Sequence, residues 1–67
     1  GPLNINTATA AQLETLDGIG QVLAQRIVDY RNANGPFASV DDLLEVNGIG
    51  PGILETIRPQ ITTEEEP

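Results

Sequence analysis

The sequence predicts an all-α domain in which one unit of two short helices is used twice. The tripeptide Gly-Ile-Gly occurs at residues 18–20 and again at residues 48–50, with the same spacing of apolar residues around both copies. A duplication of this kind indicates one supersecondary unit repeated in tandem. We therefore expect four to five short helices related by a pseudo-two-fold repeat. A shift of 30 residues pairs Thr9 with Ser39, Leu13 with Leu43, Leu16 with Val46 and Ile27 with Ile57.

The first unit, residues 7–34, begins with a capped helix. Thr9 and Gln12 have the spacing of a capping box, in which each side chain satisfies the other residue's backbone N–H. We expect the helix to begin there and to end near Asp17. Gly18 then closes it, because glycine adopts the left-handed conformation without Cβ strain.

The second helix of this unit begins directly after the tripeptide. Gly20 is a tolerated N-cap residue, and apolar positions recur at the helical spacing i, i+4, i+7. The residues at these positions are Leu23, Ile27 and Tyr30. The Asn-Gly-Pro sequence at residues 34–36 is a strong helix-ending signal and predicts the end of this helix.

The second unit, residues 37–61, repeats the first helix of the pattern. Ser39 is the predicted N-cap, and Asp41 and Asp42 lie in the first helical turn, where the positive end of the helix dipole favours carboxylates. This explanation is preferred to a metal site for the acidic pair. The predicted apolar face consists of Leu43, Leu44 and Val46.

The last helix follows the second tripeptide. Gly48 is predicted to end the preceding helix, and Pro51 takes the first helical position, where its missing N–H costs nothing. Pro59 should end or kink the helix near Arg58. The predicted inward stripe consists of Ile53, Leu54, Ile57 and Ile61.

At 67 residues the chain has the size of one small domain, which we place at residues 3–62. Residues 1–2 are interpreted as the remnant of a cleaved tag, and residues 63–67 as a disordered acidic tail. We expect the domain to be part of a larger protein. There is no apolar run of membrane-spanning length, so direct membrane insertion by this segment is not expected.

Both tripeptides are candidate anion sites. The first N–H groups of a helix have no intrahelical partner, and flanking glycines let another molecule approach the backbone. Two such turns suggest an extended polyanion, most commonly a nucleic-acid backbone. The competing explanation is that the glycines only make tight turns, with each Ile filling the core. The candidate contacts are the backbones of Gly18, Ile19, Gly20, Gln21, Val22, Gly48, Ile49, Gly50, Gly52 and Ile53, with Arg58 in addition.

The chain resembles the tandem helix-hairpin-helix module of ComEA-type competence proteins, the DNA receptors of bacterial transformation. The matching stretches are residues 4–8, 13–16, 18–20, 27–31, 35–43, 48–50 and 57–59. The resemblance implies sequence-independent binding of double-stranded DNA through hairpin amides on phosphates. It also implies display outside the cytoplasmic membrane, either anchored or periplasmic. Some hairpins of this kind hold a monovalent cation on their carbonyls, and no other cofactor is expected.

Two features depart from the family pattern. Family members commonly carry Lys or Arg in the first turn after each glycine tripeptide, whereas here residues 21–23 are Gln-Val-Leu and residues 51–53 are Pro-Gly-Ile. Asp17 stands before the first tripeptide, where the family often has a neutral Pro. The cationic part of phosphate binding is therefore missing at these positions.

The charge balance is unusual for a DNA-binding domain. The chain has ten carboxylates, three arginines and no lysine, for a net charge of −7, and the resulting field opposes a polyanion. If the domain binds DNA, either its arginines gather beside the hairpins or its affinity for DNA is weak. The alternative function is a protein-interaction module that retains the fold.

The composition argues against an enzyme. Histidine, cysteine and lysine, the most versatile catalytic side chains, are all absent. We therefore expect no catalytic residues, no metal site and no small-molecule substrate.

Overall fold

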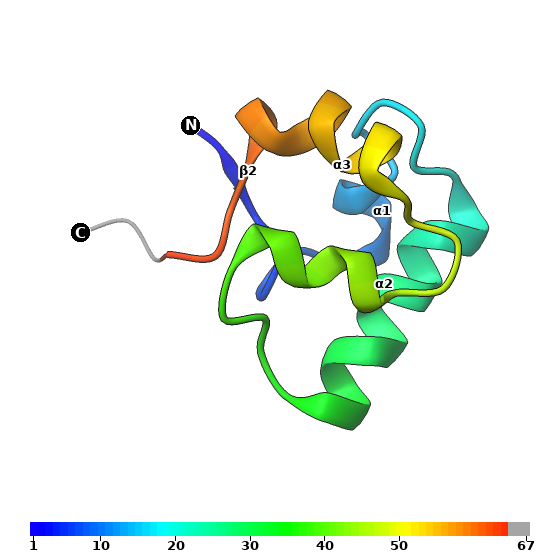
Figure 1. Ribbon diagram of the computed structural model, residues 1–67. Coiled ribbons are helices and arrows are strands. Elements are labelled where there is room, and N and C mark those ends of the chain that lie inside the picture. The colour runs from blue at the N-terminus through cyan, green and yellow to red at the C-terminus, as the bar shows by residue number, and fades with distance from the viewer. Residues whose placement is uncertain (65–67) are drawn as a thin grey trace.

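The computed structural model describes residues 1–64, which form two helical units around one core (Figure 1). Unit one contains α1 (Ala10–Leu13) and α2 (Gln21–Asn34). Unit two contains the 3₁₀ helix η1 (Val40–Glu45), α3 (Pro51–Ile57) and the 3₁₀ helix η2 (Arg58–Gln60). The predicted helical fold class is confirmed. The predicted acidic tail lies mostly outside the described residues, since residues 65–67 are not among them.

A small parallel sheet, which the sequence did not predict, joins the two ends of the described chain. It pairs β1 (Leu3–Asn4) with β2 (Ile61–Thr62), with Leu3 opposite Ile61. Ile61 is buried, as predicted, but it belongs to this strand and not to the preceding helix.

The first unit begins with the predicted capping box. The Gln12 N–H donates to Thr9 Oγ1 at 3.1 Å, and the Thr9 N–H donates to Gln12 Oε1 at 2.9 Å. The α-helix ends at Leu13, sooner than predicted. The cause is a tighter turn, in which the Leu16 N–H bonds the Leu13 carbonyl three residues earlier at 3.1 Å.

The second unit begins in the same way but with tighter winding. The Asp42 carboxylate accepts a hydrogen bond from the Ser39 N–H at 3.3 Å. Asp42 occupies the position in unit two that Gln12 occupies in unit one. Where an α-helix was predicted, η1 is a 3₁₀ helix, closed by a bond from the Val46 N–H to the Leu43 carbonyl at 3.0 Å. The first three residues of η1, residues 40–42, are Val-Asp-Asp, and these residue types have a low intrinsic propensity for the α-helix.

The core is apolar and is shared by both units. Ile19 and Ile49 are 3% and 4% exposed, so both predicted hairpin plugs are buried. Leu44 was predicted to face inward, but it is 44% exposed. With three residues per 3₁₀ turn, Leu43 and Val46 fall on one face and Leu44 falls beside it. The buried residues are Ile5, Ala8, Leu13, Leu16, Ile19, Ala24, Ile27, Phe37, Leu43, Val46, Ile49, Leu54, Ile57 and Ile61.

The long helices end where the sequence predicts. The last residue of α2 is Asn34, followed by Gly35 at φ +89°. The α-helical part of α3 ends before Arg58 and Pro59, and the chain continues as η2. The helix ends predicted from Gly35 and from Pro59 are therefore confirmed.

The N-terminal segment is fastened to the junction between the units by side chains. The Asn6 side chain donates to the Phe37 carbonyl at 3.0 Å and accepts from the Phe37 N–H at 2.7 Å. Arg31 Nη1 donates to the Ile5 carbonyl at 2.8 Å. These bonds satisfy backbone groups of Ile5 and Phe37, which lie outside the helices and strands.

Candidate nucleic-acid interface

The two Gly-Ile-Gly turns have the same backbone hydrogen bonds. In the first hairpin, residues 16–20, the Ile19 N–H donates to the Leu16 carbonyl at 3.0 Å. In the second hairpin, residues 46–50, the Ile49 N–H donates to the Val46 carbonyl at 3.1 Å. Both hairpins lie on the same side of the molecule, at the right of Figure 1. The sequence repeat is therefore also a structural repeat.

Each hairpin leads directly into a helix N-terminus. The first intrahelical bond of α2 runs from the Ala24 N–H to the Gly20 carbonyl at 2.9 Å. The N–H groups of residues 21–23 precede it, so they have no partner within the helix. In α3 the corresponding bond joins Leu54 to Gly50 at 3.1 Å. Because Pro51 has no N–H, the second hairpin offers fewer amides than the first.

The glycines of each tripeptide differ in what the fold requires of them. Gly18 and Gly48 have φ of +84° and +96°, a conformation that disfavours other residues. Gly20 and Gly50 have ordinary extended backbones at φ −91° and −103°. A Cβ added to either would meet no heavy atom within 4 Å.

Gly52 also lacks an internal reason to be glycine. It lies in α3, where glycine costs about 1 kcal/mol relative to alanine. A Cβ added there would also enter open space. At Gly20, Gly50 and Gly52 a side chain would therefore have space, and the backbone there is left uncovered.

Each hairpin packs against the second helix of the other unit. A Cβ on Gly18 would lie 4.0 Å from Cγ1 of Ile53 in α3. A Cβ on Gly48 would lie 2.8 Å from Leu23 Cδ2 and 2.8 Å from Arg26 Nη1, both in α2. Leu23 and Ile53 are equivalent in the repeat, so the pseudo-two-fold extends to the packing between units.

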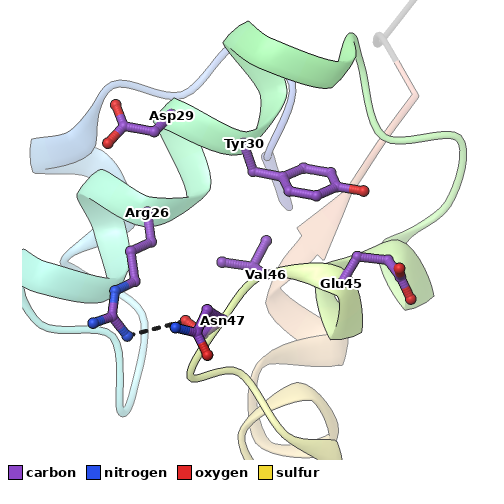
Figure 2. A pocket seen from close by; sticks show the side chains of 6 residues that line it. All are labelled: Arg26, Asp29, Tyr30, Glu45, Val46 and Asn47. Atoms are coloured by element: carbon purple, nitrogen blue, oxygen red, sulfur yellow. Dashed lines mark hydrogen bonds between the residues drawn. The ribbon is translucent and has the colours of Figure 1, made fainter.

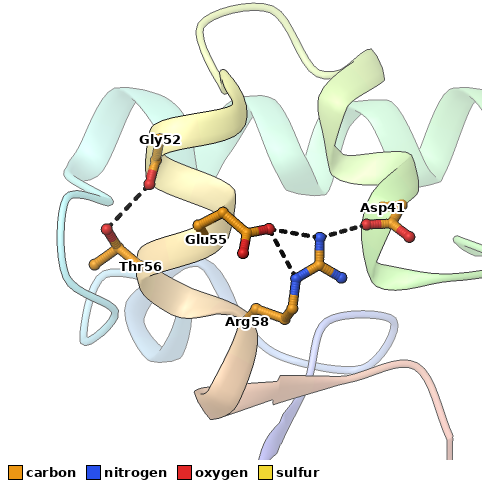
Figure 3. A network of polar contacts seen from close by, with 5 residues as sticks. All are labelled: Asp41, Gly52, Glu55, Thr56 and Arg58. Atoms are coloured by element: carbon orange, nitrogen blue, oxygen red, sulfur yellow. Dashed lines mark hydrogen bonds and ion pairs between the residues drawn. The ribbon is translucent and has the colours of Figure 1, made fainter.

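Arg58, a predicted contact residue, is held by two carboxylates. Its Nη2 lies 2.6 Å from Asp41 Oδ1 and 2.8 Å from Glu55 Oε2 (Figure 3). The hydrogen bonds to Asp41 and then to Glu55 raise the pKa of the Arg58 guanidinium above its ordinary value. A phosphate at Arg58 would have to compete with these carboxylates. Asp41 lies in the first turn of η1, as predicted, and also links that turn to Arg58.

Arg26, which was not among the predicted contact residues, lies against the second hairpin. Its Nη1 donates to the Asn47 carbonyl at 3.2 Å, across 21 residues of sequence (Figure 2). No local pattern signals such a contact. Arg26 also borders an open depression of about 440 Å³ between α2 and η1. The other residues that line it are Asp29, Tyr30, Glu45, Val46 and Asn47.

Within residues 1–64 no group of three or more His, Cys, Asp or Glu side chains is arranged to hold a metal ion. No helix in this part of the chain is long and apolar enough to cross a membrane.

The sequence is similar to several known proteins over most of its length. It is 48% identical over 62 residues to mouse endonuclease/exonuclease/phosphatase family domain-containing protein 1, covering 92% of this chain and 11% of the mouse protein. It is 40% identical over 62 residues to ComE operon protein 1 of Bacillus subtilis, covering 92% of this chain and 30% of that protein. An uncharacterized protein of Haemophilus influenzae is 50% identical over 60 residues, which cover 88% of this chain and 54% of that protein.

The chain thus spans between about a tenth and about half of the length of these relatives. The Bacillus similarity confirms the resemblance to ComEA-type proteins. A family model described as the helix-hairpin-helix motif matches residues 1–62. On the matched residues and on the two equivalent hairpins, the chain belongs to the helix-hairpin-helix family.

Proposed function

We propose that this domain binds double-stranded DNA without sequence preference, through the backbone amides of its two hairpins. The observation that carries the proposal is the absence of side chains at Gly20, Gly50 and Gly52. Neither backbone conformation nor internal space requires glycine at these positions. Glycine at these positions is explained if a ligand approaches the backbone closely there.

Phosphate oxygens fit this surface chemically. Free amides at a helix N-terminus carry partial positive charge and donate hydrogen bonds to anions. Two hairpins on one side of the molecule suit a ligand with anions at regular intervals, which is the geometry of a nucleic-acid backbone. Contacts to phosphates carry no direct sequence information. Binding without sequence preference follows.

The charge of the chain limits the affinity. At a net charge of −7 the overall field repels DNA, and Arg58 is already paired with two carboxylates. Neutral amides also release few counterions. We therefore expect modest affinity and a shallow dependence on salt, with a log–log slope of about −1 to −2. The same features favour the second candidate function, a protein-interaction module.

A titration of labelled duplex DNA distinguishes the two functions. Two duplexes of unrelated sequence should bind equally, with affinity falling as salt increases. Gly20→Gln and Gly50→Gln should each weaken binding by about tenfold, since a side chain would separate amide from phosphate. Ala33→Gln, at an exposed position near the end of α2, is the matched control. No binding at the lowest salt would favour the protein-interaction function.

The cellular setting is proposed from the family resemblance. The full-length protein would display this domain outside the cytoplasm, membrane-anchored or periplasmic, as a non-catalytic receptor for incoming DNA. Protease accessibility of the full-length protein in intact cells or spheroplasts tests the location. Protection in both preparations would contradict it.

A further inference from the structure

The second hairpin is held by a cationic side chain from the other unit. Arg26 Nη1 donates to the Asn47 carbonyl at 3.2 Å, and the same nitrogen lies 2.8 Å from the Cβ position that Gly48 leaves empty. A Cβ at Gly48 would displace the ends of the Arg26 and Leu23 side chains, and the positive φ of Gly48 disfavours other residues as well. The guanidinium thus lies directly against the second hairpin.

Arg26 keeps donors available for a ligand. A guanidinium has five N–H groups, and one of those of Arg26 bonds within the chain. The side chain is exposed, and within residues 1–64 it has no carboxylate at ion-pair distance. Arg58 has two such carboxylates, and Arg31 is partly buried against Ile5. Arg26 therefore combines an unpaired charge with a position at a hairpin.

The repeat provides an internal comparison. The residue equivalent to Arg26 in unit two is Thr56, whose hydroxyl donates to the Gly52 carbonyl of its own helix (Figure 3). Within residues 1–64, the first hairpin therefore has no cation from the opposite unit at the position equivalent to Arg26. It also has Asp17 where the second hairpin has Asn47. The two hairpins share one backbone but differ in local charge.

We propose that Arg26 contacts DNA phosphate and makes the second hairpin the stronger of the two binding points. This inference rests on the proposed function, and it names the side chain that supplies charge to an otherwise neutral site. Its bond to Asn47 positions the guanidinium beside the amides of the second hairpin, while the remaining N–H groups donate to the phosphate. The proline at position 51 leaves that hairpin with fewer amides, which the arginine offsets.

Two carboxylates border the same region and define the direction of approach. Asp29 and Glu45 line the depression next to Arg26 (Figure 2). Asp29 also accepts a hydrogen bond from Gln25. These carboxylates repel a phosphate in the depression. The phosphate therefore approaches Arg26 from the side of the hairpin.

The test compares variants of equal net charge by DNA titration over a range of salt. Arg26→Gln should weaken binding by about fivefold at low salt and bring the log–log slope closer to zero by about 1. Asn32→Asp changes the net charge equally at an exposed site near the end of α2 and should have less than about a twofold effect. Equal effects of the two variants would overturn the proposal. Weaker binding by Arg26→Gln with an unchanged slope would reduce Arg26 to a positioning residue and also overturn it.

A gain-of-function variant keeps the proposal testable if Arg26→Gln fails to fold. Thr56→Arg places the equivalent cation beside the first hairpin. It should tighten binding by about fivefold and make the slope steeper by about 1. No change in affinity or slope would contradict the role inferred from the repeat. If the unaltered domain shows no salt-dependent binding, the proposed function itself fails.

Discussion

At the residue scale, the two outer glycines of each tripeptide act differently. Gly48 has a positive φ, and a Cβ there would meet the ends of two α2 side chains, whereas Gly50 has an extended backbone and open space. The first is required by the fold and the second is available to a ligand. The same tripeptide therefore combines one position that the backbone conformation restricts to glycine with one that it does not.

Substitution by alanine should separate these two positions. Gly48→Ala should lower the free energy of unfolding by about 1 to 2 kcal/mol through left-handed strain, since the two α2 side-chain ends that a Cβ would meet can move aside. Gly50→Ala should cost about 0.5 kcal/mol, since alanine is a poorer N-cap. Chemical denaturation measures both. Equal losses in the free energy of unfolding for the two variants would contradict the conclusion that the fold requires glycine at position 48 but not at position 50.

The buried isoleucines of the hairpins should contribute strongly to stability. Ile19→Ala and Ile49→Ala should each lower the free energy of unfolding by about 2 to 4 kcal/mol, because each leaves a cavity in the core. Val22→Ala is the control at a position that is 63% exposed. It should change stability by less than about 0.5 kcal/mol. A loss too small to measure for Ile19 or Ile49 would remove the role as core plugs.

Asp17 tests whether the first hairpin contacts phosphate. Removing a like charge several ångströms from bound phosphate is worth on the order of 1 kcal/mol at low salt. Asp17→Asn should therefore strengthen DNA binding by about fivefold, with the gain fading as salt rises. Glu64→Gln, at an exposed site beyond β2, should do much less. Equal gains would mean that only net charge matters.

At the element scale, local signals determined where most helices begin and end. The capping box at Thr9, the proline at position 51 and the positive-φ glycines each act within a few residues, so the sequence predicted them correctly. The predictions of a longer α1 and of an α-helix at η1 were wrong, because a three-residue turn ends α1 and η1 winds as a 3₁₀ helix. The sheet pairs residues from opposite ends of the domain, so no local pattern indicated it.

The capping box offers a test at this scale. Thr9→Ala removes the acceptor for the Gln12 N–H and should cost about 1 kcal/mol in the free energy of unfolding. Thr7→Ala, at an exposed position outside α1, should cost less than about 0.5 kcal/mol. Thermal unfolding followed by circular dichroism compares them. An equal loss for both would show that the cap does not contribute.

The candidate site could be predicted in part, because the signals that form the hairpins are also local in the sequence. Both hairpins follow from the glycine tripeptides, and their backbone geometry is reproduced in the structure. The contacts of the arginines could not be predicted from local sequence patterns. Arg26 bonds Asn47 across 21 residues of sequence, and Arg58 bonds Asp41 across 17 residues. Long side chains reach partners that only the tertiary structure determines.

At the scale of the whole molecule, a strongly acidic chain presents two hairpins of different local charge on one side. The pseudo-two-fold brings both helix N-termini to that side, and the side-chain-free glycines expose their amides. Backbone dipoles can attract phosphate locally although the net charge of −7 opposes it at long range. Weak, geometrically defined binding is the expected result.

The most direct test of this account is a nuclear magnetic resonance titration of the ¹⁵N-labelled domain with duplex DNA. The largest amide shift changes should lie at residues 18–22 and at residues 48–53 other than Pro51, with two unrelated duplexes giving the same pattern. Amides at the C-terminal end of α2, residues 31–34, should change little. Changes concentrated in the depression between α2 and η1, or spread evenly over the domain, would contradict binding through the hairpins.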